Sequence, residues 1–149
     1  MEVKILMDGD ILWEDAMEYA LDCPWKAGRH LGEKMKHHEI KGWERVFVAY
    51  EEGDLYGFLY FAKKDCLPSL KYSPYVRYLF IDERKRGHRY GKRLIESAEQ
   101  YAFDLGFEQI YLTSDHVGLY EKYGFHPIDS FRAPWDSSTI ETVYERNLL

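Results

Sequence analysis

Residues 76–106 read VRYLFIDERKRGHRYGKRLIESAEQYAFDLG, a pattern of strand, basic turn and helix. Val76–Ile81 is rich in β-branched and aromatic residues, as buried strands are. After the turn, apolar residues recur at helical spacing, and Gly106 stands where a helix C-cap is expected. That apolar face consists of Leu94, Ile95, Ala98, Tyr101, Ala102 and Leu105. Because Gln109–Thr113 reads as the next strand, the segment predicts a β-α-β crossover over 76–81, 91–105 and 109–113.

The rest of the chain predicts more strands than helices. The expected strands are Val3–Met7, Val46–Tyr50, Leu55–Ala62, Phe125–Ile128 and Thr142–Tyr144. Glu51–Asp54, which joins the second and third of these, predicts a hairpin. The expected helices cover 11–21, 27–38 and, as a short element, 117–123. This order predicts a mixed α/β (α+β) fold in which helices cover the faces of a sheet. Neither a repeat nor a linker interrupts it, so we expect residues 1–149 to form a single domain.

The composition is that of a folded globular chain. Apolar residues make up 46% of the 149 residues and aromatic residues 17%, enough apolar surface to form one core. The longest stretch without Asp, Glu, Lys or Arg is Leu55–Ala62, far short of the roughly 20 residues of a membrane span. The N-terminal residues lack a signal-peptide pattern, and Cys23 and Cys66 cannot form a disulfide framework. We therefore expect reduced cysteines, no membrane association and a cytoplasmic location.

Positive charge is concentrated in one short segment. Residues 84–93 contain six Lys and Arg residues and no acid, and taking these charges away from the net charge of −6 leaves −12 on the rest. A basic segment on an acidic chain favours a local anionic ligand over a nucleic acid. A solvated charged face is the alternative at this point.

The basic segment overlaps the expected start of the long helix, near Tyr90 and Gly91. The first N–H groups of a helix have no intrahelical acceptor, and the helix dipole favours negative charge there. Gly87 and Gly91 allow close approach of the backbone. Neither a Walker A loop nor the G-x-G-x-x-G fingerprint fits, because three residues separate the two glycines and Lys92 precedes Arg93. The segment predicts a phosphate or pyrophosphate site of another kind.

Two motifs resemble those of the GNAT-type (GCN5-related) N-acetyltransferases. Arg86–Gly91, RGHRYG, is similar to the pyrophosphate loop Q/R-x-x-G-x-G/A, with Arg89 in place of the first glycine. Leu119–Phe125, LYEKYGF, is similar to the L-Y-E-K-x-G-F segment that follows the fifth strand of the family. The two occur in the family's order, and the resemblance implies a central mixed, mostly antiparallel sheet flanked by helices.

The resemblance also implies an activity. It would be transfer of an acetyl group from acetyl-CoA to a primary amine by direct attack, with no metal. Tyr120 is the expected general acid, since a phenol of pKa about 10 can protonate a thiolate whose acid has a pKa of about 8.5. A backbone N–H of Leu79–Ile81 is the expected oxyanion donor if a bulge frees it. The expected cofactor-binding residues are Leu79, Phe80, Ile81, Arg86, Gly87, His88, Arg89, Tyr90, Gly91 and Lys92.

Two departures separate the chain from the family pattern. Arg89 resists positive φ, which predicts a tighter loop or a guanidinium contact to phosphate. The connection Ser114–Gly118 is short and lacks the Asn-x-x-Ala pattern, so no side-chain contact to the pantetheine arm is expected there.

The acceptor and the general base are left open. Base candidates are Asp65, Glu44, His116, His37 and His38, with an ordered water as an alternative. Trp13, Trp25, Trp43 and Trp135 are candidates for the acceptor pocket or for core packing. The acidic surroundings favour a cationic acceptor such as a polyamine, an aminoglycoside or a lysine side chain. A non-catalytic acyl-CoA-binding sensor or interaction module is the alternative function, and the chain is expected to be a monomer or homodimer.

Overall fold

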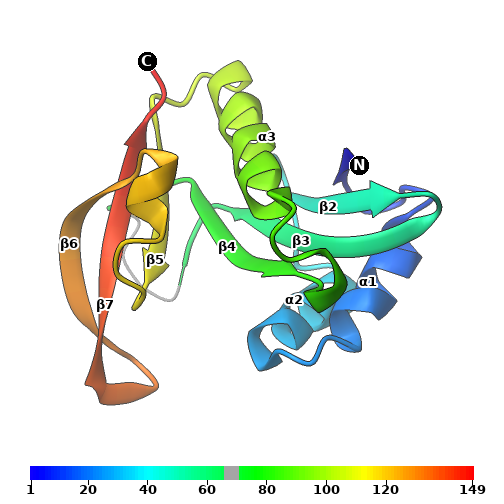
Figure 1. Cartoon of the computed structure of the whole chain (residues 1–149), viewed down its shortest axis with the longest axis horizontal. Helices are drawn as coiled ribbons and strands as arrows, with labels where there is room; N and C mark the ends of the chain where they lie inside the picture. Colours follow the sequence, from blue (N-terminus) through cyan, green and yellow to red (C-terminus); the bar gives the residue numbers. More distant parts are fainter. Residues whose placement is uncertain (66–70) are drawn as a thin grey trace. The chain divides into compact units, whose positions relative to one another are not determined.

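The computed structural model describes residues 1–65 and 71–149 (Figure 1), so Cys66 lies outside the described residues. The strands are β1 Glu2–Leu6, β2 Arg45–Glu51, β3 Asp54–Ala62, β4 Tyr75–Ile81, β5 Gln109–Ser114, β6 His126–Ala133 and β7 Asp136–Asn147. The α-helices are α1 Trp13–Leu21, α2 Lys26–Lys36 and α3 Tyr90–Asp104, and 3₁₀ turns occur at η1 Glu83–Lys85 and η2 Tyr120–Tyr123. These elements confirm the mixed α/β fold class.

The described residues cluster into two compact units. Unit 1 comprises Met1–Phe61 and Tyr78–Ala98, and unit 2 comprises Ala62–Arg77 and Glu99–Leu149, so β4 and α3 contribute residues to both. None of the helices in the described ranges is long and apolar enough to cross a membrane.

Unit 1 is built on an antiparallel meander. β1 pairs with β2 from Glu2↔Tyr50 to Leu6↔Val46, and β2 pairs with β3 from Arg45↔Phe61 to Glu51↔Asp54. The hairpin expected at Glu51–Asp54 is therefore confirmed. Both faces of this meander are covered, since consecutive side chains point to opposite faces and are buried alike. The most deeply buried of them include Val46, Phe47, Val48, Phe58, Leu59 and Phe61.

Close packing of α1, α2 and β3 in unit 1 depends on small residues. A Cβ on Gly28 would lie 2.7 Å from the Cys23 sulfur and 2.9 Å from the Phe58 ring. One turn later, a Cβ on Gly32 would lie 2.7 Å from the Leu21 backbone nitrogen. Cys23 itself is a free, buried thiol, as expected. Because real Cβ atoms do not approach so closely, α2 needs glycine at both positions.

Unit 2 contains the parallel strand pair. Tyr75 of β4 pairs with Tyr111 of β5 in parallel, and α3 lies between these strands in the chain, which confirms the β-α-β crossover. β5 pairs antiparallel with β7, and β7 pairs antiparallel with β6. Tyr75, Tyr111 and Val143 form a buried cluster against which Tyr72, Ile128 and Phe131 pack.

Two predictions in the C-terminal part were wrong in extent. β6 and β7 form a long hairpin over 126–133 and 136–147 (Figure 1), not the short strands Phe125–Ile128 and Thr142–Tyr144. Their outer part is mostly exposed and carries Ser137, Ser138 and Thr139, so it lacks the apolar alternation that marks a strand. The helix expected over 117–123 is the single turn η2, which ends where Gly124 adopts φ +89°.

Candidate functional site

The start of α3 in unit 1 has the backbone geometry of an anion-binding turn. Asp82 caps η1, its Oδ1 accepting the Arg84 N–H at 3.0 Å. Gly87 then adopts φ +84° and Arg89 φ +62°, and the Arg89 carbonyl accepts the Arg93 N–H at 3.1 Å as the first helical bond. Two left-handed residues, two apart, turn the chain from η1 into α3.

Several N–H groups at this turn are available to a ligand. In the part of the chain that the structure describes, five have no acceptor, those of Gly87, Arg89, Tyr90, Gly91 and Lys92. The His88 N–H donates to the Lys85 carbonyl at 3.3 Å. Residues 87–89 and 92 are exposed. The expectation of exposed amides at the start of this helix is therefore met.

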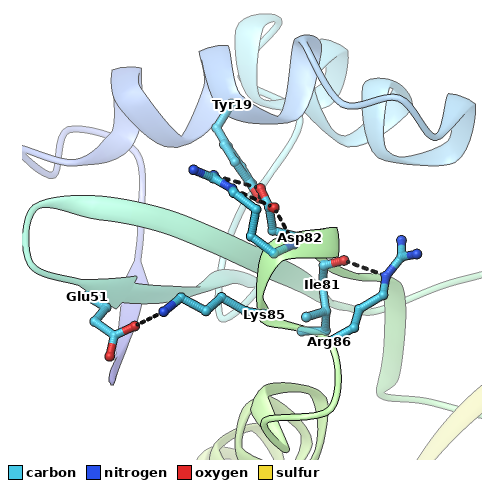
Figure 2. Close-up of polar contacts among 7 residues, drawn as sticks. Tyr19, Glu51, Ile81, Asp82, Lys85 and Arg86 are labelled. Atoms are coloured by element: carbon cyan, nitrogen blue, oxygen red, sulfur yellow. Dashed lines mark hydrogen bonds and ion pairs between the residues drawn. The ribbon is translucent and has the colours of Figure 1, made fainter.

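Two cations of the basic segment are already paired within unit 1 (Figure 2). Arg84 donates from Nε and Nη2 to the two oxygens of Asp82, each at 2.9 Å, and Lys85 Nζ lies 3.0 Å from Glu51. The Arg84 guanidinium holds the pKa of Asp82 well below its usual range. The formal charge of the segment therefore overstates what an anionic ligand would meet.

The other cations differ in their partners. Arg86 Nε donates to the Ile81 carbonyl at 3.3 Å, and its guanidinium points away from Asp82 and Glu51 (Figure 2). Arg89 is exposed and forms no ion pair among the described residues. Lys92 lies 3.8 Å from Glu96, and Arg93 donates to the Met1 carbonyl at 2.7 Å. Arg86, Arg89 and Arg93 thus contact no described carboxylate, and of these only Arg89 also lacks a hydrogen bond to a described carbonyl.

Arg89 adopts the conformation that it was expected to resist. Its φ of +62° is the left-handed region that glycine enters freely, and for a residue with a Cβ this costs about 1 kcal/mol. The turn is therefore not tightened by the arginine. It keeps a glycine-like backbone and adds a guanidinium beside the open N–H groups.

Glu51, Asp82 and Tyr19 support this turn, and sequence reasoning missed all three. The buried Tyr90 donates its hydroxyl to Glu51 at 2.6 Å, so only its backbone N–H remains for a ligand. The Tyr19 hydroxyl donates to Asp82 at 3.0 Å (Figure 2). Burial and the Asp82 charge raise the pKa of Tyr19, so this hydroxyl stays protonated.

β4 offers its backbone rather than its side chains. Phe80 is buried and packs against Phe58 and Trp25, with ring centroids 5.3 and 6.4 Å apart. A Cβ on Gly57 would lie 2.5 Å from the Phe80 carbonyl, so glycine lets β3 approach β4 closely. Tyr78 adopts φ +53° within the strand, which breaks regular β geometry just before Leu79.

The four tryptophans have different surroundings. Trp13 is a buried core residue of unit 1, and Trp43 packs on Phe61 with centroids 5.5 Å apart. Trp25 is 41% exposed and stacks on Phe80, so one of its faces remains open. Trp135 is exposed at the turn between β6 and β7.

Tyr120 lies on η2 of unit 2 within an aromatic cluster. Its ring centroid is 5.9 Å from that of Tyr144 and 6.4 Å from those of Tyr123 and Phe125. Burial raises the pKa of the Tyr120 phenol, with smaller contributions from Tyr123, Tyr144 and Asp115. Its hydroxyl forms no hydrogen bond to any described residue. A protonated phenol without an internal acceptor can donate its proton to a ligand.

The neighbouring motif residues have structural roles. Glu121 accepts the Gly118 N–H at 2.8 Å, and both Glu121 and Lys122 are exposed, as expected. At Gly124, a Cβ would overlap the Arg146 guanidinium, which donates to the Tyr123 carbonyl at 2.8 Å. The glycine of this motif therefore makes room for an arginine that holds the end of η2.

The base candidates of unit 1 are surface residues with local partners. His37 lies 3.3 Å from Glu33 on the same helix, and His38 lies 2.5 Å from Asp8. The side chain of Glu44 accepts the Lys41 N–H at 3.3 Å.

The base candidates of unit 2 lie near the end of β5. Asp65 accepts the Thr113 hydroxyl at 3.1 Å and lies 3.4 Å from Arg77. The His116 ring is largely exposed, while its backbone carbonyl accepts the Tyr144 hydroxyl at 2.9 Å. The buried Glu141 on β7, a further acidic residue of this unit, was not a candidate from the sequence.

Comparison with known proteins decides the family. The family model described as "Acetyltransferase (GNAT) family" matches residues 10–125, most of the chain. The chain belongs to the GNAT acetyltransferase family. The match includes both motifs, the turn at 86–91 and the segment 119–125, so the resemblance seen in the sequence is confirmed.

Solved GNAT structures share the fold at low sequence identity. An aminoglycoside 6′-acetyltransferase type Ii has a TM-score of 0.77 at 16% identity, with 100% of this chain and 98% of that chain covered. An aminoglycoside 6′-N-acetyltransferase complexed with coenzyme A has a TM-score of 0.74 at 14% identity and the same coverage. The aminoglycoside 6′-N-acetyltransferase from Enterococcus faecium gives 0.75 at 14% identity, again covering 100% and 98%. Among curated protein sequences, no match is found.

Proposed function

We propose that this GNAT protein is an N-acetyltransferase that moves an acetyl group from acetyl-CoA to a primary amine. The observation that carries the proposal is the turn before α3, where five N–H groups without an acceptor among the described residues accompany Arg86 and Arg89. Such a turn suits a diphosphate, because N–H groups, helix dipole and guanidinium groups all favour the same anion. The solved relative complexed with coenzyme A supports this reading.

The residues proposed to hold the cofactor act mostly through their backbone. Gly87, Arg89, Tyr90, Gly91 and Lys92 offer N–H groups, and Arg86 and Arg89 add positive charge. The exposed His88 borders the turn, and Leu79, Phe80 and Ile81 offer backbone groups after the distortion at Tyr78. The cofactor would supply an acetyl group activated as a thioester. No described group of three or more His, Cys, Asp and Glu residues could hold a metal ion.

Tyr120 is proposed as the general acid. Its aromatic surroundings raise the pKa of the phenol, so the proton stays on the oxygen at neutral pH until a stronger base, a thiolate, is formed. A backbone N–H of Leu79–Ile81 would stabilise the charge that develops on the acetyl oxygen. A neutral amine can then attack the thioester directly, without a covalent enzyme intermediate.

The acceptor is proposed to be a cationic small-molecule amine. The three solved relatives described above are named for acetylation of aminoglycosides, which carry several amino groups. The net negative charge outside residues 84–93 also favours a positively charged substrate, because opposite charges attract.

Calorimetry with acetyl-CoA, followed by a free-thiol release assay across a panel of amines, tests the proposal. Tyr120→Phe should bind acetyl-CoA like the wild type and lower turnover about 100-fold, the lower range for loss of a general acid. Tyr123→Phe, on the same turn, is the matched control and should change turnover less than about twofold. Acetyl-CoA binding without thiol release on any amine would favour the non-catalytic sensor, and wild-type turnover by Tyr120→Phe would exclude Tyr120 as the acid.

A further inference from the structure

Glu141 is a buried residue whose carboxylate has no hydrogen-bond or ion-pair partner among residues 1–65 and 71–149. Among the described residues it is the one charged residue that is more than nine-tenths buried, with 7% of its surface exposed. It forms neither a hydrogen bond nor an ion pair with any other described residue. A buried carboxylate without compensation is costly, and such groups are paired in most proteins. Among the described residues nothing supplies that compensation for Glu141.

The strand register places Asp115 beside Glu141 in unit 2, and a hydrogen bond of Thr113 connects Asp65 to the same face. β5 and β7 pair through Thr113↔Val143 and Ser114↔Thr142, so the next positions along the two strands are Asp115 and Glu141. Opposed residues of an antiparallel pair share a face of the sheet, and Thr113 shares this face with Glu141. The Thr113 hydroxyl donates to Asp65 at 3.1 Å, which adds Asp65 to the same face.

The surroundings of Glu141 are dominated by negative charge. Burial raises the pKa of its carboxyl, and the charges of Asp115 and Asp65 raise it further, while His116 opposes them. Asp65 is partly compensated by Arg77 at 3.4 Å, and Asp115 lies 4.0 Å from His116. Burial and these like charges disfavour the ionised form of Glu141, and a cation bound nearby would offset their effect.

The spacing of these carboxylates favours an organic cation over a metal ion. No group of three or more potential ligands in the described ranges is close enough to hold a metal ion. An ammonium group differs from a metal ion, because one or two carboxylate oxygens can accept its hydrogen bonds. One molecule can also carry several ammonium groups at separate positions. Separate carboxylates at the end of β5 match that distribution of charge.

We propose that Glu141, with Asp115 and Asp65 beside it, binds an ammonium group of a polycationic amine, the acceptor of the proposed acetyl transfer. The assignment of this ligand as the acceptor depends on the proposed function, whereas binding itself does not. Asp115 connects the two, since its charge acts on both the Glu141 carboxyl and the Tyr120 phenol. A cation at Glu141 would therefore lie at the same end of unit 2 as the proposed acid.

Calorimetry on the full chain with two probes, kanamycin A and spermidine, tests this site. Glu141→Gln removes the charge and keeps the shape, and it should weaken binding of at least one probe about tenfold, which corresponds to about 1.4 kcal/mol. The matched control is Glu108→Gln, which removes one charge at an exposed position of the same unit and should change affinity less than about twofold. Acetyl-CoA binding should be the same in all three proteins.

A second variant keeps the test decisive if Glu141→Gln fails to fold. Asp115 is exposed, so Asp115→Asn should fold normally and weaken binding of the same probe several-fold. Equal affinities of wild type, Glu141→Gln and Asp115→Asn would overturn the proposal, as would the absence of binding by either probe at millimolar concentration. Charge-dependent amine binding without acetyl-CoA binding would instead leave the site standing and refute the proposed function.

Discussion

Gly124 offers a test of how the LYEKYGF motif holds Tyr120. Its φ of +89° places it in the left-handed region, and a Cβ there would overlap the Arg146 guanidinium and lie 2.7 Å from Arg146 Cζ. Gly124→Ala must therefore strain the backbone and also displace Arg146. That side chain donates to the Tyr123 carbonyl at 2.8 Å and lies 2.5 Å from Glu99, so its movement breaks both contacts.

The expected loss of stability follows from these two effects. A left-handed alanine costs about 1 kcal/mol, and losing a charge-assisted hydrogen bond at a half-exposed arginine costs about 1.5 kcal/mol more. For a chain of this size, 1 kcal/mol shifts Tm by roughly 3 °C, so Gly124→Ala should lower Tm by about 7 °C. Thermal unfolding followed by circular dichroism measures this change.

Gly118 provides the control. It has nearly the same conformation, φ +87°, but no atom of the described residues lies within 4 Å of the position where its Cβ would be. Gly118→Ala should therefore show the backbone cost alone, a decrease in Tm of about 3 °C. In an Arg146→Ala background, Gly124→Ala should fall to the same value. If both alanine variants lower Tm equally in the wild-type background, the proposed role of Arg146 is refuted.

Three further predictions concern other residues. The Tm of Arg89→Gly should be about 3 °C higher than that of Arg89→Ala, because glycine adopts the left-handed conformation without strain. Both variants should bind coenzyme A equally weakly. If both bind it with wild-type affinity, the guanidinium does not contact the ligand. Asp82→Asn should lower Tm at pH 7, because the folded-state pKa of Asp82 is depressed, and the difference should narrow as pH falls below about 4, where wild-type Asp82 loses its advantage. Glu141→Gln should raise Tm at pH 8, because the folded state disfavours the ionised carboxyl of Glu141. This increase in Tm should fade as the pH falls toward 4.5, the ordinary pKa of a glutamate. A Tm difference that is independent of pH would contradict the raised pKa.

The sequence was most informative where local patterns control structure. The helical spacing of the apolar residues in Leu94–Leu105 predicted α3, and Gly53 between two β-rich runs predicted the hairpin of β2 and β3. The open N–H groups at Tyr90–Lys92 follow from the position of the helix start alone. Such features depend on residues a few positions apart, which periodicity and turn chemistry report directly.

The residues missed by sequence reasoning depend on contacts distant in the chain. Tyr19 and Asp82 are 63 positions apart, and Glu51 and Tyr90 are 39 apart, so no local pattern links them. At Arg89, the need to turn the chain into α3 outweighed the steric preference of the residue. Glu141 had a weak signal, since it occupies the same strand face as the buried Val143, where a carboxylate is out of place.

The buried position of Phe80 bears on how this strand can change during evolution. Its ring packs against Phe58 and Trp25, so any chemistry at that point of β4 must use main-chain atoms, which every amino acid possesses. Replacement by another apolar residue of similar volume would preserve those atoms as long as the interior remains filled. Proteins that diverge from a common ancestor could therefore keep the main-chain groups of this strand in place while few of its residues stay identical.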